Sequence, residues 1–323
     1  MKCLFIVDPI ETLDPGHDTT VALMEATQAR NHEVWITAMP TLGVSQGCAR
    51  ALVQPVTLNP VRLVNDRWQI PQPWFELGAS EMKMLEDFSV VFMRKDPPVT
   101  VPYLYATYIL DYVNPEKTLV INRPEGLRAA NEKMYALQFT SVIPETIVSQ
   151  SKAEIKAFLA QREAAVLKPL GGKAGEGILF LDGNDRNLNS LIEISTLQGQ
   201  MPVMIQQFLP EAKLGDKRII LLNGEPIGAV NRVPTGSEFR GNMAVGGRVE
   251  AAKLTERDRF ICTQVAPALQ RDGLYFVGID VIGDYLTEVN VTSPTGIREI
   301  DRLDGVCLGD QVIQWIERLI IKN

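Results

Sequence analysis

Three side chains that could bind a metal ion lie in a segment whose apolar pattern predicts two buried strands. The segment FVGIDVIGDYLTEVNVTSPTG carries Asp280, Glu288 and Asn290 among its apolar residues. Residues two apart in a strand share a face, so Glu288 and Asn290 point the same way. A three-residue turn would place Asp280 opposite Glu288, whereas a two-residue turn would place Thr287 there. The first register predicts a Mg²⁺ site of oxygen ligands, although a face exposed to water explains the same pattern.

A glycine-rich loop between two apolar stretches is the second candidate. In AAVLKPLGGKAGEGILFLD, Lys168 ends a strand and is followed by Gly171, Gly172, Gly175 and Gly177. Glycines let backbone N–H groups approach phosphates closely. The loop matches neither a Walker A motif nor a dinucleotide fingerprint, and a simple connection between strands is the commoner explanation.

A third segment, VMIQQFLPEAKLGDKRII, has the composition of a base-binding slot. Gln206, Gln207, Phe208 and Leu209 could offer a purine an apolar surface and backbone hydrogen bonds, or be ordinary core. Arg218, farther along, could pair with an acid or hold a phosphate.

Charged residues elsewhere suggest how an anionic substrate could be held. The segment RVPTGSEFRGNMAVGGR carries Arg232, Arg240 and Arg248, which suits either a lid over an anion or a solvated loop. Arg94 follows a strand at the carboxyl end, where open α/β sheets bind ligands. Asp18 is expected to cap a helix, whose N-terminus could also receive a carboxylate.

Composition excludes several other functions. The 323 residues carry a net charge of −7, which argues against nucleic acid or an anionic membrane as a partner. The four cysteines form no Cys-x-x-Cys pair and no stretch resembles a signal peptide or a spanning helix, so a cytoplasmic protein is expected. Only two histidines are present, which makes a His-rich zinc site or a Ser-His-Asp triad improbable.

The elements that would position these residues predict an α/β (α+β) protein of three parts. Strands at 2–7 and 33–39 around a helix form a βαβ unit with a parallel sheet, giving a domain over 1–122. A helix at 126–139 opens a small α+β unit, 123–200. The remainder, 201–323, is rich in strands, with an Asn-Gly hairpin. It ends in an amphipathic helix that could pack internally or on a partner.

The order of these features resembles the ATP-grasp superfamily of carboxylate–amine ligases, and within it the prokaryotic glutathione synthetases. The stretches that carry the resemblance span the chain: IVDPI, VFMRKDPP, YATYIL, NEK, LKPL, GDKRI, RGNMAVGGR and LTEVNVTSPTGIREI. The resemblance implies an N-terminal parallel-sheet domain, a small central lid domain and a C-terminal antiparallel-sheet domain. It implies that ATP, γ-glutamylcysteine and glycine give glutathione, ADP and phosphate through an acyl phosphate, and that the enzyme is a homotetramer.

The same resemblance assigns roles to individual residues. It implies that Lys133, Lys168 and the loop glycines contact phosphates, that residues 206–209 bind adenine, and that Asp216 lies near the ribose. It places further nucleotide contacts at Asn242, Gly246 and Gly247, and Mg²⁺, or Mn²⁺, on Asp280, Glu288 and Asn290. It places Arg218, Arg232 and Arg240 at the reacting carboxylate, and Asp18 and Arg94 at the dipeptide. The loop GGKAGEG departs from the family pattern in having Lys173 and Glu176 among its glycines.

Two other functions compete with this interpretation. One is a different ATP-grasp ligase, such as a D-alanine–D-alanine ligase or a glutamate-adding enzyme, which MRKDPP and RGNMAVGGR disfavour. The other is a non-catalytic nucleotide-binding protein, which the intact lysines and acids disfavour. A Rossmann dehydrogenase lacks its fingerprint.

Overall fold

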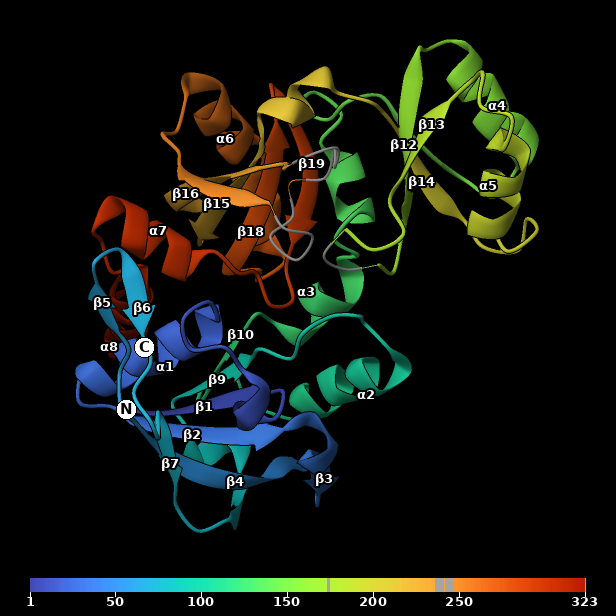
Figure 1. Cartoon of the computed structure of the whole chain (residues 1–323). Coiled ribbons are helices and arrows are strands. Elements are labelled where there is room, and N and C mark those ends of the chain that lie inside the picture. The colour runs from blue at the N-terminus through green and yellow to red at the C-terminus, as the bar shows by residue number, and fades with distance from the viewer. Residues whose placement is uncertain (173–174, 236–240, 242–246, 323) are drawn as a thin grey trace.

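The computed structural model describes residues 1–172, 175–235, 241 and 247–322. The described chain is organised around three main sheets with helices on their faces (Figure 1). No helix in the part described is long and apolar enough to cross a membrane.

The N-terminal sheet has a parallel centre and an antiparallel flank. Four parallel strands are ordered β10-β9-β1-β2, and β4 then pairs antiparallel with β2 and carries β3, β7 and β8. The strands are β1 (Lys2–Val7), β2 (Glu33–Ala38), β3 (Gly43–Ser45), β4 (Cys48–Leu58), β7 (Phe75–Leu77), β8 (Glu81–Met84), β9 (Val90–Met93) and β10 (Leu119–Ile121). A small hairpin, β5 (Arg62–Val64) and β6 (Arg67–Gln69), lies apart from this sheet.

Both faces of the parallel strands are covered, which explains why β1 is apolar almost throughout. Phe5 faces α1 (Thr19–Ala29), while Leu4 packs in the cluster that includes Tyr103 of α2 (Val101–Leu110). The predicted cap is confirmed, since Asp18 accepts hydrogen bonds from the backbone N–H groups of Thr20 and Val21.

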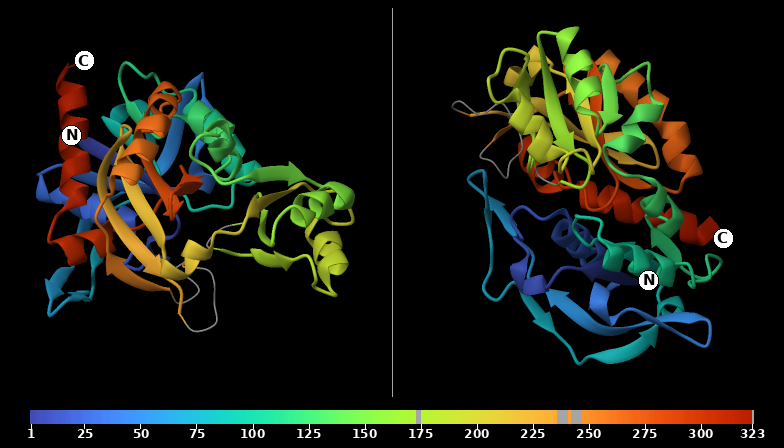
Figure 2. Two further views of the ribbon diagram at one scale, coloured as in Figure 1. Left: turned by 90° about the horizontal axis from the view of Figure 1, so that it is seen from above. Right: turned by 90° about the vertical axis from the view of Figure 1, so that its right-hand side faces the viewer.

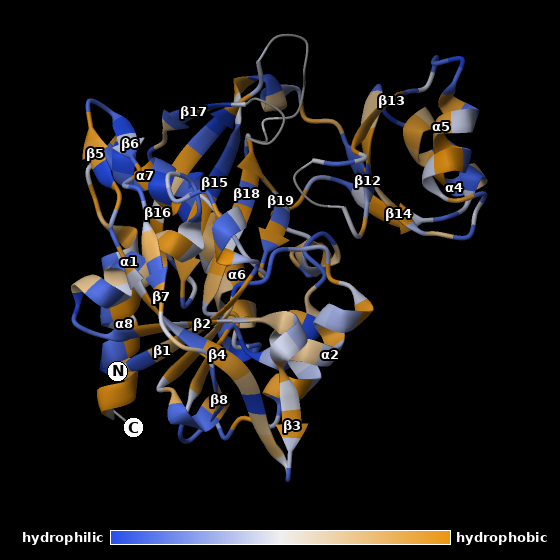
Figure 3. Cartoon of the chain, turned by 60° about the horizontal axis from the view of Figure 1, so that its bottom comes forward, coloured by the Kyte–Doolittle hydropathy of each residue, from blue (hydrophilic) through white to orange (hydrophobic). Residues whose placement is uncertain are grey.

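A four-stranded antiparallel sheet forms a separate lobe, which stands away from the other two sheets (Figure 1 and Figure 2). Its order is β11-β14-β12-β13, and Leu188 and Ile192 of α5, a helix that is largely orange in Figure 3, pack in the lobe's own core. The elements are β11 (Thr146–Ser149), α4 (Lys152–Ala160), β12 (Ala164–Pro169), β13 (Leu179–Asp182), α5 (Leu188–Ser195) and β14 (Val203–Gln207).

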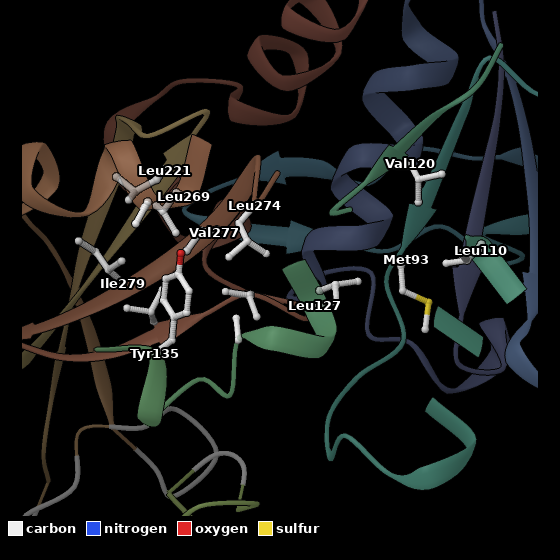
Figure 4. Packing of buried hydrophobic residues seen from close by; sticks show 14 of the residues in the cluster. Met93, Leu110, Val120, Leu127, Tyr135, Leu221, Leu269, Leu274, Val277 and Ile279 are labelled. Atoms are coloured by element: carbon white, nitrogen blue, oxygen red, sulfur yellow. The ribbon is translucent and has the colours of Figure 1, made fainter. Parts of the chain in front are cut away.

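The third sheet is antiparallel and has the order β17-β16-β15-β18-β19. The predicted Asn-Gly hairpin is confirmed, because Asn223 and Gly224 join β15 to β16 with positive φ values of 52° and 85°. Leu127 and Tyr135 lie with Val277 and Ile279 in one apolar cluster, so the segment before the lobe packs on this sheet (Figure 4). The elements are β15 (Asp216–Leu222), β16 (Glu225–Val233), β17 (Arg248–Ala251), α6 (Glu256–Arg271), β18 (Phe276–Ile282), β19 (Tyr285–Asn290) and α7 (Ile297–Asp304).

The helix predicted at 126–139 is wrong in one respect, because it is broken in the middle. It consists of α3 (Pro124–Ala129) and a 3₁₀ turn, η4 (Met134–Gln138). Between them Asn131 Oδ1 accepts hydrogen bonds from the backbone N–H groups of Lys133 and Met134, at 3.2 and 3.0 Å. An asparagine that satisfies nearby backbone donors competes with helix formation.

The C-terminal helix α8 (Leu308–Lys322) packs inside the chain. Val312 and Ile316 are fully buried in the cluster that contains α1. Arg30, just after α1, donates to Asp310 at 2.8 Å and to both carboxylate oxygens of Glu317 at 3.0 and 2.7 Å. Of the two arrangements that the sequence left open for this helix, the internal one is observed, and the two termini lie close together (Figure 2).

Candidate active site

One cleft of about 310 Å³ collects residues of the lobe and of the C-terminal sheet together with loops of the N-terminal part of the chain. Most of the side chains predicted from the sequence line it, although they are spread over more than 150 positions of the chain. They are Lys133, Lys168, Gly172, Gly175, Gln206, Gln207, Phe208, Leu209, Asp216, Arg218, Arg232, Asp280, Glu288 and Asn290.

The hairpin β18–β19 brings the three predicted metal ligands together. Asp280 pairs with Glu288, and Gly278 pairs with Asn290, so both carboxylates and the amide share one face. The turn itself has two residues, which would have put Thr287 opposite Asp280. A β-bulge at this point adds the missing residue and restores the pairing with Glu288.

Asp280 is held by two buried arginines. Arg218 donates from Nε to Oδ1 and from Nη2 to Oδ2, at 2.5 and 2.9 Å, and Arg232 Nη2 lies 3.0 Å from Oδ1. Burial alone would raise the pKa of the Asp280 carboxyl, but the two guanidinium charges outweigh it and hold that pKa well below its usual range. Asp280 is therefore an anion in the folded protein.

Asp216 completes this cluster with an unused acceptor. Its Oδ2 accepts from Arg232 Nη2 at 2.6 Å, whereas its buried Oδ1 has no hydrogen-bond partner among the described residues. Burial raises the pKa of Asp216, although the neighbouring arginines oppose the shift.

Two lysines bring ammonium groups to the same cleft. Lys133 Nζ lies 3.0 Å from Glu288 Oε1 and donates to the carbonyl of Gly172 at 2.8 Å. Lys168 Nζ donates to Gln206 Oε1 at 2.8 Å and has no ion pair among the described residues, and its burial lowers its pKa. A half-buried ammonium without a carboxylate partner can receive an anionic ligand.

An apolar part of the cleft lies beside the connection between β14 and the 3₁₀ turn η5 (Pro210–Leu214). Phe208 and Leu209 of this connection line the cleft together with Val166, Ile178 and Ile282. The Phe208 ring meets the Phe180 ring edge-on with centroids 5.0 Å apart. Flat apolar surface of this kind is what a purine base needs.

The two residues predicted to hold the dipeptide do not line the cleft. Asp18 serves as the α1 cap, and Arg94 is buried with 4% of its surface exposed. Arg94 Nε donates to Thr20 Oγ1 at 3.0 Å and Nη2 to the carbonyl of Pro294 at 3.1 Å. Gly171, Gly177 and Gly247 are also outside the lining. Arg240, Asn242 and Gly246 lie outside the described residues.

Several cleft residues were not identified from the sequence. Glu132 accepts from the backbone N–H groups of Val291 and Thr292 at 3.2 Å and from Thr292 Oγ1 at 2.8 Å. Burial and then the charge of Glu288 raise the Glu132 pKa. The sequence signal that could have identified Glu132 was its place in the NEK stretch, which carries part of the family resemblance. His17 also lines the cleft and gave no pattern of its own. Asp96 and residues 292–295 line it too, and they belong to the stretches MRKDPP and LTEVNVTSPTGIREI.

The predicted metal ligands fit a hard divalent ion. Glu288 Oε2 and Asn290 Oδ1 accept no hydrogen bond among the described residues, and both side chains line the cleft beside Asp280. Carboxylate and amide oxygens are the donors that Mg²⁺ prefers. In the described parts of the chain, no group of three or more His, Cys, Asp and Glu side chains is arranged to hold a metal. Such an ion would therefore need phosphate oxygens or water to complete its shell.

The fold and the cleft define an ATP-grasp ligase. The chain superposes on the ATP-grasp ligase PsnB complexed with a minimal precursor with a TM-score of 0.61, at 17% identity over 97% of this chain and 98% of that one. The model of the prokaryotic glutathione synthetase N-terminal domain matches residues 1–128, and the model of the ATP-grasp domain of the same enzymes matches residues 132–305.

Two curated relatives named glutathione synthetase extend over the whole chain. That of Synechococcus elongatus is 68% identical over 99% of both chains, and that of Thermosynechococcus vestitus is 68% identical over 98% of this chain and 99% of its own. The chain belongs to the prokaryotic glutathione synthetase family. It is an ATP-dependent ligase that forms glutathione from γ-glutamylcysteine and glycine.

Proposed function

We propose that the cleft between the lobe and the C-terminal sheet carries out both steps of this reaction. The observation that carries the proposal is the convergence of Lys133, Lys168, Arg218 and Arg232 with Asp280 and Glu288 in one cleft. Four cations suit a triphosphate and a substrate carboxylate, while the two acids suit the metal ion that accompanies a nucleotide.

ATP binds with its adenine in the apolar part formed by residues 206–209 and its ribose near Asp216. Lys133 and Lys168 donate to phosphate oxygens, and the glycine loop covers the phosphates with backbone N–H groups. We assign further nucleotide contacts to Gly247, and to Asn242 and Gly246, which lie outside the described residues.

The first step transfers the γ-phosphoryl group to the cysteinyl carboxylate of γ-glutamylcysteine. Arg218, Arg232 and Arg240 orient that carboxylate and stabilise the negative charge that spreads over the transferred group. Asp280, Glu288 and Asn290 would hold a metal ion, which would neutralise negative charge during the phosphoryl transfer. Mg²⁺ is the metal that we propose, and Mn²⁺ takes the same ligands.

In the second step the amine of glycine attacks the acyl carbon, the amide bond forms and phosphate leaves. No covalent bond to the protein is needed, which agrees with the lack of a histidine or cysteine nucleophile among the residues assigned to the cleft chemistry. Water must be excluded because it would hydrolyse the acyl phosphate.

Asp18 and Arg94 help to position the dipeptide by hydrogen-bonding to the backbone of segments near the cleft. Arg94 joins α1, through Thr20, to the carbonyl of Pro294, and Pro294 lines the cleft. Asp18 fixes the start of α1 next to His17. We further propose a cytoplasmic homotetramer with small molecules as its only substrates.

The test is release of ADP from MgATP, with γ-glutamylcysteine and glycine added separately and together and D-alanine as the control acceptor. ADP release and glutathione formation only when both substrates are present support the proposal. ADP release with D-alanine and not with glycine would assign the cleft to another ATP-grasp reaction.

A further inference from the structure

Three consecutive residues of α7 hold the loop that carries His17. The backbone N–H of Ile297 donates to Thr19 Oγ1 at 3.3 Å, and Arg298 Nε donates to the carbonyl of Pro15 at 3.0 Å. Glu299 forms a short hydrogen bond with His17 Nδ1. The His17 ring is therefore fixed at the cleft by the C-terminal part of the chain, although His17 itself lies in the loop before α1.

His17 presents a donor to the cleft. With Nδ1 bonded to Glu299, the other ring nitrogen, Nε2, has no partner among the described residues, and 41% of the side chain is exposed. The hydrogen bond to Glu299 raises the His17 pKa, against the effect of burial, and the charges of Asp14 and Asp18 act in the same direction as Glu299. A carboxylate partner of this kind favours the imidazolium form.

Asp96 presents the opposite charge from the neighbouring strand. It lies beyond β9, which pairs in parallel with β1, so the loops carrying His17 and Asp96 leave the same edge of the sheet. Asp8 ties this loop down, since its carboxylate accepts from the backbone N–H of Asp96 at 3.2 Å and pairs with Lys95 at 2.9 Å. The Asp96 carboxylate itself has no partner in the described parts of the chain and lines the cleft.

The reaction indicates which substrate group could use these two charges. The cysteinyl carboxylate is phosphorylated and the glycine amine forms the new bond, so neither can be held as a permanent ion. The γ-glutamyl head keeps an α-ammonium and an α-carboxylate from substrate to product. Lys168, Arg218 and Arg232 lie on strands of the other two sheets, whereas His17 and Asp96 reach the cleft from loops of the N-terminal part of the chain.

We propose that His17 binds the α-carboxylate and Asp96 the α-ammonium group of the γ-glutamyl moiety. This assignment rests on the proposed function, and it moves the dipeptide contacts from Asp18 and Arg94 to their neighbours His17 and Asp96. His17 and Asp96 are then binding residues that select a γ-linked α-amino acid, while Glu299 positions His17.

The test uses two dipeptides that each lack one charge. 4-Aminobutanoyl-cysteine lacks the α-carboxylate, and glutaryl-cysteine lacks the α-ammonium group. His17→Gln should raise KM for γ-glutamylcysteine about 10- to 100-fold, the usual value of a charge-assisted hydrogen bond, and leave KM for 4-aminobutanoyl-cysteine unchanged. Asp96→Asn should likewise raise KM for γ-glutamylcysteine and leave KM for glutaryl-cysteine unchanged. KM for ATP and for glycine should not move.

The controls separate binding from folding. His32→Gln changes the other histidine, which hydrogen-bonds to Glu317 at α8, and Asp304→Asn changes an exposed acid of α7; both should keep the KM of the unaltered protein. His17→Lys restores a cation and should recover part of the lost affinity. Equal losses with γ-glutamylcysteine and with the analogue, or a shift in KM for glycine instead, would overturn the proposal.

Failure of this inference is distinguishable from failure of the proposed function. If the unaltered protein makes glutathione and the variants show no selective loss, only the head-group assignment is wrong. If the unaltered protein makes no glutathione from the two substrates, the proposed function fails first.

Discussion

Arg218 donates two hydrogen bonds to the Asp280 carboxylate, at 2.5 and 2.9 Å, and both side chains are buried. A residue proposed to stabilise the reacting carboxylate therefore also holds a residue proposed to bind metal. Removing either side chain would leave the charge of the other unpaired in the interior, which lowers the stability of the fold.

Asp280→Asn should destabilise the protein by about 3–5 kcal/mol, because Arg218 and Arg232 lose their common counter-charge. Denaturant unfolding measures this directly. Adding Arg218→Met should recover part of the lost free energy of unfolding, since it removes one of the two unpaired positive charges. The exposed Asp304→Asn is the matched control, with a change within about 0.5 kcal/mol. Additive losses in the double variant would show that the pair is not coupled.

Glu288→Gln should abolish turnover while the fold persists. The side chain keeps its shape and its partner Lys133, but a carboxylate oxygen for the metal is lost. Release of ADP at several Mg²⁺ concentrations is the measurement, with the exposed Glu256→Gln as control. Undiminished turnover would remove Glu288 from the metal site.

Lys168→Met should have opposite effects on stability and on nucleotide binding. The half-buried ammonium has no carboxylate partner among the described residues and its pKa is lowered by desolvation, so its loss should leave the melting temperature equal or higher. KM for ATP should rise about 10- to 100-fold, because a phosphate contact is removed. Lys156→Met, on an exposed face of the same lobe, should change neither quantity. A large fall in the melting temperature would mean that Lys168 is a structural residue.

The His17–Glu299 pair should make stability depend on pH. The folded pKa of His17 lies above 6.5, so the pair stabilises the fold fully below the unfolded pKa and loses this contribution as pH rises through the folded value. The difference in melting temperature between the unaltered protein and Glu299→Gln should therefore be larger at pH 6 than at pH 9. A difference that does not change with pH would contradict a charged pair.

Ile316→Ala should destabilise the protein by about 2–5 kcal/mol, because its side chain is fully buried between α8 and the rest of the chain. Ile321→Ala, in the same helix but 83% exposed, should have almost no effect. Unfolding midpoints should be compared together with the mass in solution. A change in oligomeric state with no loss of stability would mean that α8 is packed against another subunit.

Much of the architecture, and many of the residues that line the cleft, could be predicted from the sequence alone. Apolar periodicity, the Asp18 cap and the Asn223-Gly224 turn predicted β1, α1 and the β15–β16 hairpin, because these elements form from local preferences. Ordered motifs from Lys133 to Asn290 identified the family, and most of their residues do line one cleft.

Tertiary structure decided what local patterns could not specify. The bulge opposite Asp280 set the register that turn length alone would have predicted wrongly. The Asn131 side chain broke a helix that periodicity had continued, and so brought Glu132 and Lys133 into the cleft. Long-range packing through Arg298 and Glu299 placed His17 there as well. Such contacts join residues that lie more than 250 positions apart, where no sequence pattern records which side chain will fill a cleft and which will be buried behind it.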